Sequence, residues 1–481
     1  MIRAVPVFRV LGGLLIGLGL MMTPSLIADA AAPGQGGAPF LVGAAAAVIA
    51  GLTLLLLSAS DEAFELSRRQ AFLITGLAWL VLPAFAGVPF LFLGLSPAGA
   101  YFEAASGLTT TGATVISGLD SQSSGILLWR SMLQMVGGLG IIVLGILVMP
   151  FLRVGGMQLF RTESSDQSEK IFAKGLDLAR WIAGVFIGLI LVCAVVYAAL
   201  GMSAFDAINH AMSTISTGGF STHDASFAYF ASPALEWAGA FFMLIGGLPF
   251  VALIRTVRGR RDALFTDVQA RGFILFLFVA TAFVGVTHSV TNAVLIEDAL
   301  RLAAFNVISV VTTTGFASAD YQAWGPFAFG AFFLLTFVGG CSGSTAGGIK
   351  IYRLQILWKL ARAHLTRIVS PSHVVVLSYS TRRIDDETAF AILTFLVAML
   401  ATLAVFTLAL SLIGLDFVTS LTSALTCITN VGPGLGPIVG PAGNFAPLPD
   451  AAKAVLSLAM ILGRLEFFTL LVMLTPAFWR G

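Results

Sequence analysis

The sequence predicts an all-α membrane protein with four pseudo-repeats around a central pore, preceded by two N-terminal transmembrane helices. Each repeat is expected to hold a helix, a re-entrant pore helix with its loop, and a second helix. Three observations support this fold class: the composition, a recurring Thr/Gly segment and the distribution of basic residues. The 481 residues are 58% hydrophobic and 10% charged, whereas soluble domains carry about 25% charged residues. The apolar runs have the length of helices that cross a ~30 Å hydrocarbon core, about 20 residues.

The N-terminal segment has two interpretations. Arg3 and Arg9 precede an apolar stretch that ends at Ala28-Asp29-Ala30, which resembles a secretory signal peptide with a small-residue cleavage site. The alternative is a first membrane helix over 5–28, followed by a second over 38–58. We favour the helix because the apolar run continues on both sides of its centre and a second span follows after a short loop.

Four short Thr/Gly segments recur at nearly even spacing through the rest of the chain. These Thr/Gly loops, numbered 1 to 4 along the chain, are 109–112, 215–218, 312–315 and 429–432. Each follows a half-length segment and lies between two membrane-length apolar runs. We therefore expect four units, each with an outer helix, a half-helix that dips in from outside, a loop and a second full helix.

The expected boundaries give ten full spans and four re-entrant half-helices. In the four units they are 72–94, 101–111, 112–118 and 125–151; 177–200, 204–217, 218–224 and 234–254; 272–290, 298–314, 315–321 and 325–353; and 388–413, 416–431, 432–438 and 452–479. The corresponding organisation is an N-terminal extension (1–60) and pore repeats 61–165, 166–262, 263–384 and 385–481. The third repeat also carries a basic cytoplasmic loop, whose composition fits either interfacial anchoring or docking of a cytosolic regulator.

Basic residues support this topology. With both termini inside, 22 of the 26 Lys and Arg residues fall on the cytoplasmic side, as the positive-inside rule requires. Arg130, Arg301 and Lys453 fall outside, and Arg464 falls within the last span. The sequence thus predicts a multi-pass protein with its N- and C-termini in the cytoplasm.

Non-helical backbone at membrane depth is tolerated only where it lines water or is buried in protein. Four such loops therefore imply one shared cavity, unless they are ordinary polar turns between helices. The C-terminal ends of the half-helices would carry about −0.5 charge each toward that cavity, which favours a cation. Rings of backbone carbonyls form cation filters, and glycine allows the backbone conformations that such rings need.

The loop sequences resemble the filter loops of the Trk/Ktr/HKT superfamily, over segments 108–115, 216–220, 312–316 and 429–434. The two extra N-terminal spans resemble its bacterial Trk-type potassium-uptake membrane subunits, and the resemblance covers essentially the whole chain. It implies a homodimer in the bacterial cytoplasmic (inner) membrane, with one pore per protomer and a cytosolic nucleotide-binding regulatory subunit as partner. Potassium would be the transported ion, with no organic cofactor in this chain.

The resemblance also implies the filter residues. They are Thr110, Thr111, Gly112, Ser216, Thr217, Gly218, Thr313, Thr314, Gly315, Asn430, Val431 and Gly432. In related plant transporters a serine at the first filter glycine goes with sodium preference, and here Gly112 favours potassium. The hydroxyls of these loops fit two roles equally, as ion ligands or as caps of the half-helix ends.

A Gly/Ser loop at 339–350 interrupts the second helix of the third unit. It resembles the intramembrane gate of the superfamily, and the alternative is a kinked helix that passes close to a neighbour. Arg464 lies near the centre of the last span, where a charge costs about 2.5–3.5 kcal/mol, so it should face water or an ionic partner. The gate residues implied are Gly343, Ser344, Thr345, Ala346, Gly347 and Arg464. The alternative for Arg464 is a structural ion pair, with Glu466 or with another helix.

Other function classes fit poorly. A net charge of +2 gives no nucleic-acid footprint, and three scattered cysteines form no metal spacing. An intramembrane hydrolase would need a His-Glu-x-x-His motif or a nucleophile with its base, and neither is recognisable. We therefore expect no enzyme. The closer alternative to potassium uptake is a sodium or unselective monovalent cation transporter on the same scaffold.

Overall fold

The computed structural model describes residues 4–31, 36–59, 67–144, 168–372, 376–380 and 382–480. Within these ranges seven helices are long and apolar enough to cross a membrane, and up to nine if two bent pairs each count as one span. The predicted helical membrane protein is confirmed at this level. Two pairs of two-residue strands are the only β-structure in the described residues.

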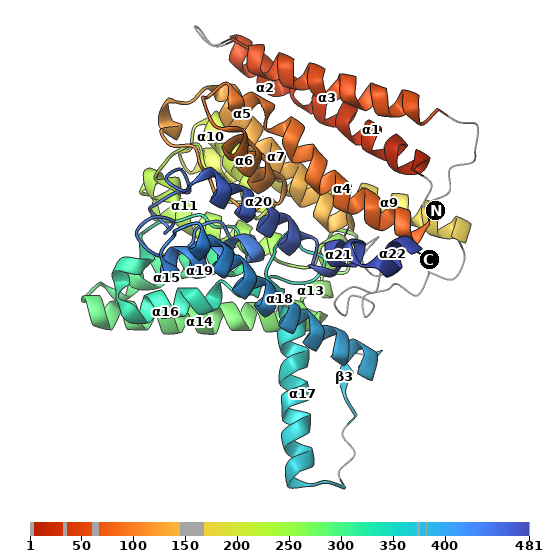
Figure 1. Cartoon of the computed structure of the whole chain (residues 1–481). Helices are drawn as coiled ribbons and strands as arrows, with labels where there is room; N and C mark the ends of the chain where they lie inside the picture. Colours follow the sequence, from red (N-terminus) through yellow and green to blue (C-terminus); the bar gives the residue numbers. More distant parts are fainter. Residues whose placement is uncertain are drawn as a thin grey trace.

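The N-terminal helices form a hairpin that packs against the rest of the bundle (Figure 1). Helix α1 (Val5–Met21) continues into α2 (Thr23–Ala31), and both pack on α3 (Ala38–Leu57). Gly12 and Gly51 face each other, and a Cβ on either would come closer than 3.0 Å to the other's carbonyl oxygen. Small residues at a membrane helix interface allow this close approach. The buried Asp29 accepts hydrogen bonds from the Gly125 N–H and the Ser123 hydroxyl, which ties the hairpin to the start of α7.

The helices of the first two units follow the expected order. The first unit holds α4 (Arg68–Ala86), α5 (Val88–Leu91), α6 (Pro97–Leu108), η1 (Leu119–Ser121) and α7 (Ser124–Val143). The second holds α9 (Ser168–Ala199), α10 (Ala204–Ile215), η4 (Ser226–Phe230), α11 (Pro233–Gly246) and α12 (Phe250–Val257). The last part of the expected helix 125–151 lies outside the described residues.

The third and fourth units contain most of the irregular elements. The third holds α13 (Ala263–Thr266), α14 (Val268–Asn292), α15 (Ile296–Val311), η5 (Tyr321–Trp324), α16 (Pro326–Leu335), β1 (Val338–Gly339), β2 (Ile349–Lys350) and α17 (Ile351–Val369). The fourth begins with β3 (Ser378–Tyr379) and β4 (Arg382–Arg383) and continues with α18 (Asp386–Leu412), α19 (Phe417–Thr429), α20 (Asp450–Arg464), α21 (Phe468–Leu471), η6 (Val472–Leu474) and α22 (Pro476–Arg480). Strands β1 and β2 pair in parallel, and β3 and β4 pair antiparallel.

Local sequence explains where three of the four half-helices begin. Ser96, Ser203 and Asp416 precede α6, α10 and α19, and each side chain accepts the N–H of the residue three positions later. This cap satisfies one of the backbone donors that a helix start leaves open. At Asp416 the hydrogen bonds from Thr419 lower the pKa of the carboxyl, so the cap stays ionised at neutral pH.

The prediction of continuous second helices in units two and four is wrong. Helices α11 and α12 meet at 101°, where Gly247 and Pro249 end one helix and start the next. Helix α20 and the α21–η6 segment meet at 103°, where Glu466 and Phe467 both have positive φ. In the third unit the break at the Gly/Ser loop occurs as expected, but α17 runs on to Val369, well past the expected end at 353.

The units pack in a cyclic order. Half-helix α6 packs on α20 of the fourth unit, α10 on α7 of the first, and α15 on α11 of the second. Val431, at the end of α19, joins the cluster built by α14, α15 and α16 of the third unit. Each half-helix therefore contacts the preceding unit, which brings the ends of all four together. Helix α17 projects away from this bundle (Figure 1).

Candidate functional site

The four half-helices end in the same backbone turn, in which two residues adopt the left-handed conformation. The first of each pair are Thr110, Thr217, Thr313 and Asn430, with φ of 51°, 51°, 57° and 57°. The second are Gly112, Gly219, Gly315 and Gly432, with φ of 85°, 77°, 83° and 108°. Threonine rarely adopts this conformation. Its recurrence in three loops shows that the surrounding packing enforces one geometry on all of them.

This comparison shifts loop 2 by one residue. The sequence analysis aligned Gly218 with the glycines of the other loops, but the backbone places Gly219 there. Hydrogen bonding agrees, because the N–H groups at the third loop position each donate to the carbonyl five residues earlier. Those residues are Thr111, Gly218, Thr314 and Val431. Loop 2 therefore spans 216–219. The missed signal was the shared Gly-Phe step, Gly219-Phe220 in loop 2 and Gly315-Phe316 in loop 3.

The loops close into a ring in chain order. A Cβ added to each left-handed glycine would come closer than 3.0 Å to a carbonyl oxygen of the next loop, which real Cβ atoms essentially never show. The pairs are Gly112 with Gly218, Gly219 with Thr314, Gly315 with Val431, and Gly432 with Thr111. Only glycine allows backbones to approach in this way. The ring thus gathers carbonyls from four half-helix C-termini, where the helix dipoles are negative.

Most hydroxyls in the ring bind protein groups. Thr109, Ser216, Thr312 and Thr429 each donate to the carbonyl four residues earlier, which caps the half-helix end. In loops 1 and 3 the first and third Thr hydroxyls also bind each other, at 2.6 and 2.8 Å. These contacts favour the capping role for the first residue of each loop. The Thr110 hydroxyl is buried, and no described residue binds it.

All four left-handed glycines line a single cavity on one side of the ring. Its wall also includes Arg130, His223, Asp224 and Asn444. Asp224 accepts the N–H groups of Gly118 and Leu119, and His223 Nδ1 lies 2.5 Å from an Asp120 carboxylate oxygen. The loops that follow the first two half-helices are therefore tied together above the ring. The His223 hydrogen bond lowers the pKa of the Asp120 carboxyl.

The Gly/Ser loop covers the opposite side of the ring. The Gly347 N–H donates to Thr313 Oγ1 at 2.6 Å, and the Gly348 N–H donates to the Thr429 carbonyl at 2.9 Å. The Thr345 hydroxyl lies 3.1 Å from the Thr217 hydroxyl. Three of the four Thr/Gly loops are thus bonded to this segment.

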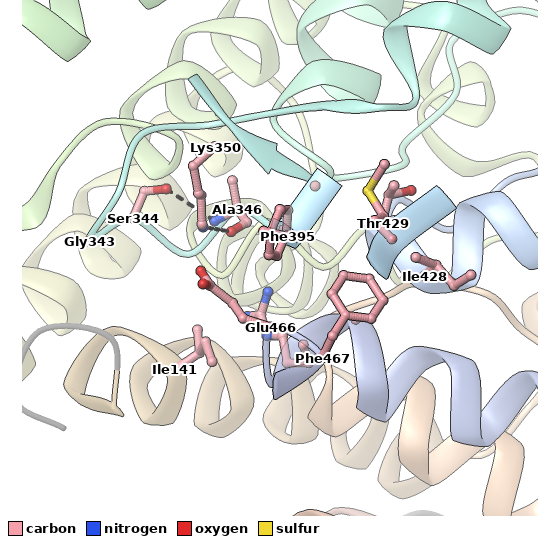
Figure 2. A pocket seen from close by; sticks show the side chains of 15 residues that line it. Ile141, Gly343, Ser344, Ala346, Lys350, Phe395, Ile428, Thr429, Glu466 and Phe467 are labelled. Atoms are coloured by element: carbon pink, nitrogen blue, oxygen red, sulfur yellow. Dashed lines mark hydrogen bonds between the residues drawn. The ribbon is translucent and has the colours of Figure 1, made fainter. Parts of the chain in front are cut away.

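Further hydrogen bonds hold the Gly/Ser loop against the break between α11 and α12. The Gly343 carbonyl accepts the Phe250 N–H, and the Cys341 N–H donates to the Gly247 carbonyl. Within the loop, the Ser344 hydroxyl donates to the Cys341 carbonyl. Of the predicted gate residues, Gly343, Ser344, Ala346, Gly347 and Arg464 line a second cavity beside the loop (Figure 2). Thr345 instead points at the ring.

Charged side chains gather at this second cavity. Arg464 is 3% exposed, and its Nη1 donates to the Thr345 carbonyl at 2.9 Å. Its Nε and Nη2 have no hydrogen-bond partner in the described part of the chain. The predicted alternative of an Arg464–Glu466 pair is wrong, because Glu466 pairs with Arg353 at the start of α17. Lys350 Nζ donates to the Ala346 carbonyl, and the Glu466 side chain points toward the same loop (Figure 2).

Sequence reasoning missed two buried charged side chains that bond the segments following loops 1 and 2. Arg130 was counted only among the charges that fall outside. It forms a buried ion pair with Glu103 at 2.8 Å, and Glu103 also accepts the Val115 N–H. Arg130 donates to the Ser221 carbonyl as well, and so connects the chain after loop 1 to the chain after loop 2. A glutamate and an arginine within otherwise apolar helices were the available signal.

The fold and this site define a polytopic helical membrane protein in which four half-helices meet at a ring of backbone carbonyls. A family model described as a cation transport protein, TrkH, matches residues 39–480. The chain belongs to this TrkH family of transport proteins, which are not enzymes.

Individual relatives agree along nearly the whole chain. The chain is 46% identical to the Trk system potassium uptake protein TrkI of Halomonas elongata, over 90% of this chain and 89% of the relative. It is 38% identical to TrkH of Escherichia coli, over 87% of this chain and 88% of that protein. The crystal structure of the potassium transporter TrkH from Vibrio parahaemolyticus superimposes with a TM-score of 0.91 and 32% identity, covering 100% of both chains.

Proposed function

We propose that this protein takes up potassium across the bacterial cytoplasmic membrane through a selectivity filter formed by the four Thr/Gly loops. The observation that carries this proposal is the closed ring in which each loop presents a carbonyl to the left-handed glycine of the preceding loop. A dehydrated monovalent cation needs such a shell of carbonyl oxygens. The four units 61–165, 166–262, 263–384 and 385–481 then act as pore repeats, with 1–60 as an extension. The names of the relatives support potassium as the ion.

Transport needs no chemical step in this chain. An inside-negative membrane potential supplies ~2.3 kcal/mol per charge per 100 mV, enough to concentrate a cation. Potassium passes as the transported ion and not as a resident cofactor. The negative ends of four half-helix dipoles lower the cost of its dehydration at the ring.

The Gly/Ser loop and Arg464 form the gate in this proposal. The loop is bonded to three Thr/Gly loops from the cytoplasmic side, and the Arg464 guanidinium holds the Thr345 carbonyl there. A cation that leaves the ring inward meets both the loop and a positive charge. Opening therefore requires the loop to leave the ring and Arg464 to lose its bond to Thr345.

The assembly expected from the resemblance is also part of the proposal. Two copies form a homodimer with separate pores, both termini face the cytoplasm, and a cytosolic nucleotide-binding subunit acts on the gate. Helix α17 begins directly after the Gly/Ser loop and projects from the bundle (Figure 1). A subunit that binds and displaces α17 would therefore move the loop.

Rubidium and sodium uptake into liposomes under an inside-negative potential tests the central claim. We expect rubidium uptake that potassium inhibits and sodium does not. Equal rubidium and sodium fluxes would support an unselective cation pathway instead. If the wild type carries neither ion, Arg464→Ala separates a closed gate, which the change opens, from a wrong pore assignment, which it does not rescue.

A further inference from the structure

One residue of α7 holds loop 2 in a way that has no equivalent at the other loops among the residues that the structure describes. The Gln134 side chain is 0% exposed and lies directly behind the ring. Its Nε2 donates to the Gly218 carbonyl at 2.7 Å, and its Oε1 accepts the Phe220 N–H at 3.1 Å. A carbonyl needs a donor and an N–H needs an acceptor, so only this orientation of the amide satisfies both.

Gly218 lies at the third loop position, where the other loops carry a side chain. The corresponding residues are Thr111, Thr314 and Val431. The Thr111 and Thr314 hydroxyls bind the first residue of their own loops. Loop 2 lacks this internal bond because Gly218 has no side chain to make it.

The space beside Gly218 is occupied by Gln134. A Cβ added at Gly218 would come closer than 3.0 Å to the Cδ, Oε1 and Nε2 atoms of the glutamine. Gly218 does not have positive φ, unlike Gly219, so its backbone conformation does not require glycine. Space, and not torsion, is what excludes a side chain at this position.

We infer that Gln134 stands in for the missing side chain of loop 2 and is a positioning residue that sets the ion selectivity of the ring. The inference rests on the proposed filter function. The Gly218 carbonyl is the one that faces Gly112 of loop 1, so its direction fixes one side of the ring. By bonding that carbonyl and the Phe220 N–H together, the glutamine fixes the peptide groups on both sides of Gly219.

Neighbouring contacts make this support rigid. Arg130 lies one helical turn before Gln134 on α7, donates to the Ser221 carbonyl at 2.8 Å and lies 4.1 Å from the Phe220 ring centre. On the other side of Gln134, a Cβ at Gly137 would collide with the Leu108 carbonyl at the end of α6. Helix α7 therefore contacts the end of α6 and the chain that follows loop 2, and Gln134 lies between these contacts.

The test measures the ratio of rubidium to sodium uptake by the full chain in liposomes. Gln134→Met keeps the length of the side chain but removes both hydrogen bonds. We expect the ratio to fall by about tenfold, the equilibrium equivalent of one lost hydrogen bond to a buried carbonyl. Gln355→Met is the matched control, because this glutamine also binds a backbone carbonyl and the Tyr379 hydroxyl but lies in α17, outside the ring. Its ratio should equal that of the wild type.

A double-mutant cycle tests the stand-in relation itself. Gly218→Ala adds a methyl group that displaces the Gln134 side chain, and Gln134→Ala removes that side chain beyond its Cβ. Each change alone should therefore lower the rubidium-to-sodium uptake ratio. The pair Gln134→Ala with Gly218→Ala should lower it no further than the more severe single change, because both act on one contact. Gly218→Ala also reports on the contact if Gln134→Met does not fold.

The outcomes separate this inference from the proposed function. A selective wild type whose Gln134→Met variant keeps the same ratio overturns the inference and leaves the filter in place. Additive effects of the two alanine changes would likewise show that Gln134 and Gly218 act independently. A wild type with equal rubidium and sodium fluxes overturns the filter, and the role of Gln134 with it.

Discussion

Replacing Gly219 with alanine tests whether the tertiary structure or the sequence pattern gives the correct register of loop 2. Gly219 has φ of 77°, and an added Cβ would collide with the Thr314 carbonyl of the next loop. The left-handed conformation alone costs an alanine roughly 1–2 kcal/mol. The collision must additionally push loops 2 and 3 apart, which widens the ring at one junction.

The control for this change is Gly201→Ala. Gly201 also has positive φ, at 111°, but nothing lies within 4 Å of its added Cβ. The Gly201→Ala variant therefore has the torsional cost of about 1–2 kcal/mol without any contact with the ring. The two variants should lose similar thermal stability in detergent, apart from the collision.

Their transport should differ. We expect Gly219→Ala to lower the rubidium-to-sodium uptake ratio in liposomes at least as much as Gly112→Ala does, by roughly tenfold or more if the widening costs potassium even ~1.4 kcal/mol relative to sodium. Gly201→Ala should keep the wild-type ratio. A Gly219→Ala protein that folds and keeps full selectivity would refute the assignment of Gly219 to the ring.

Three further predictions concern charged groups. Arg464→Ala should raise rubidium uptake in the absence of any regulator, because it removes a positive charge from the inner exit; an unchanged or lower flux would argue against the barrier. Arg130→Met should lower the unfolding free energy by about 3–5 kcal/mol, because it leaves a buried carboxylate unpaired, and adding Glu103→Gln should recover part of the melting temperature. The hydrogen bond from His223 lowers the pKa of Asp120 in the folded protein below its unfolded value of about 3.9. The bond therefore stabilises the fold above that unfolded value, and this contribution is lost as pH falls through the folded pKa. Melting temperatures between pH 6 and pH 3, a range chosen around that ~3.9 value, should therefore fall more steeply for the wild type than for His223→Ala, and parallel curves would contradict the coupling.

Local features of the sequence were enough to find the elements of the site. Apolar runs of membrane length located the helices, but the expected start of the first half-helix, at 101, missed the cap of α6 at Ser96. The Gly/Ser loop was recognisable because so many glycines cannot sustain a helix. Arg464 was identified because an isolated charge in an apolar run demands a polar environment.

Other features required contacts between distant parts of the chain. Loop 2 offers two consecutive glycines, and glycine tolerates both signs of φ, so the Gly-Phe step shared with loop 3 became a register signal only once the backbone identified Gly219. The partner of Glu466 is Arg353, 113 residues away, and not its neighbour Arg464. Gln134 looked like an ordinary residue of an apolar helix. Only the fold brings it into contact with the Gly218 carbonyl, which lies 84 residues further along the chain.

The sequence by itself thus determined the membrane class, the four Thr/Gly loops and the interrupted helix of the third unit, because hydropathy, capping and helix breaking act over a few residues. Only the tertiary structure decided the register of loop 2, the order of the loops in the ring, the bends after α11 and α20, and the pairing of buried charges. Those features depend on which backbone carbonyl or side chain occupies the space beside a residue. That space is filled by segments about a hundred residues away, because each half-helix packs on the preceding unit and not only on its own.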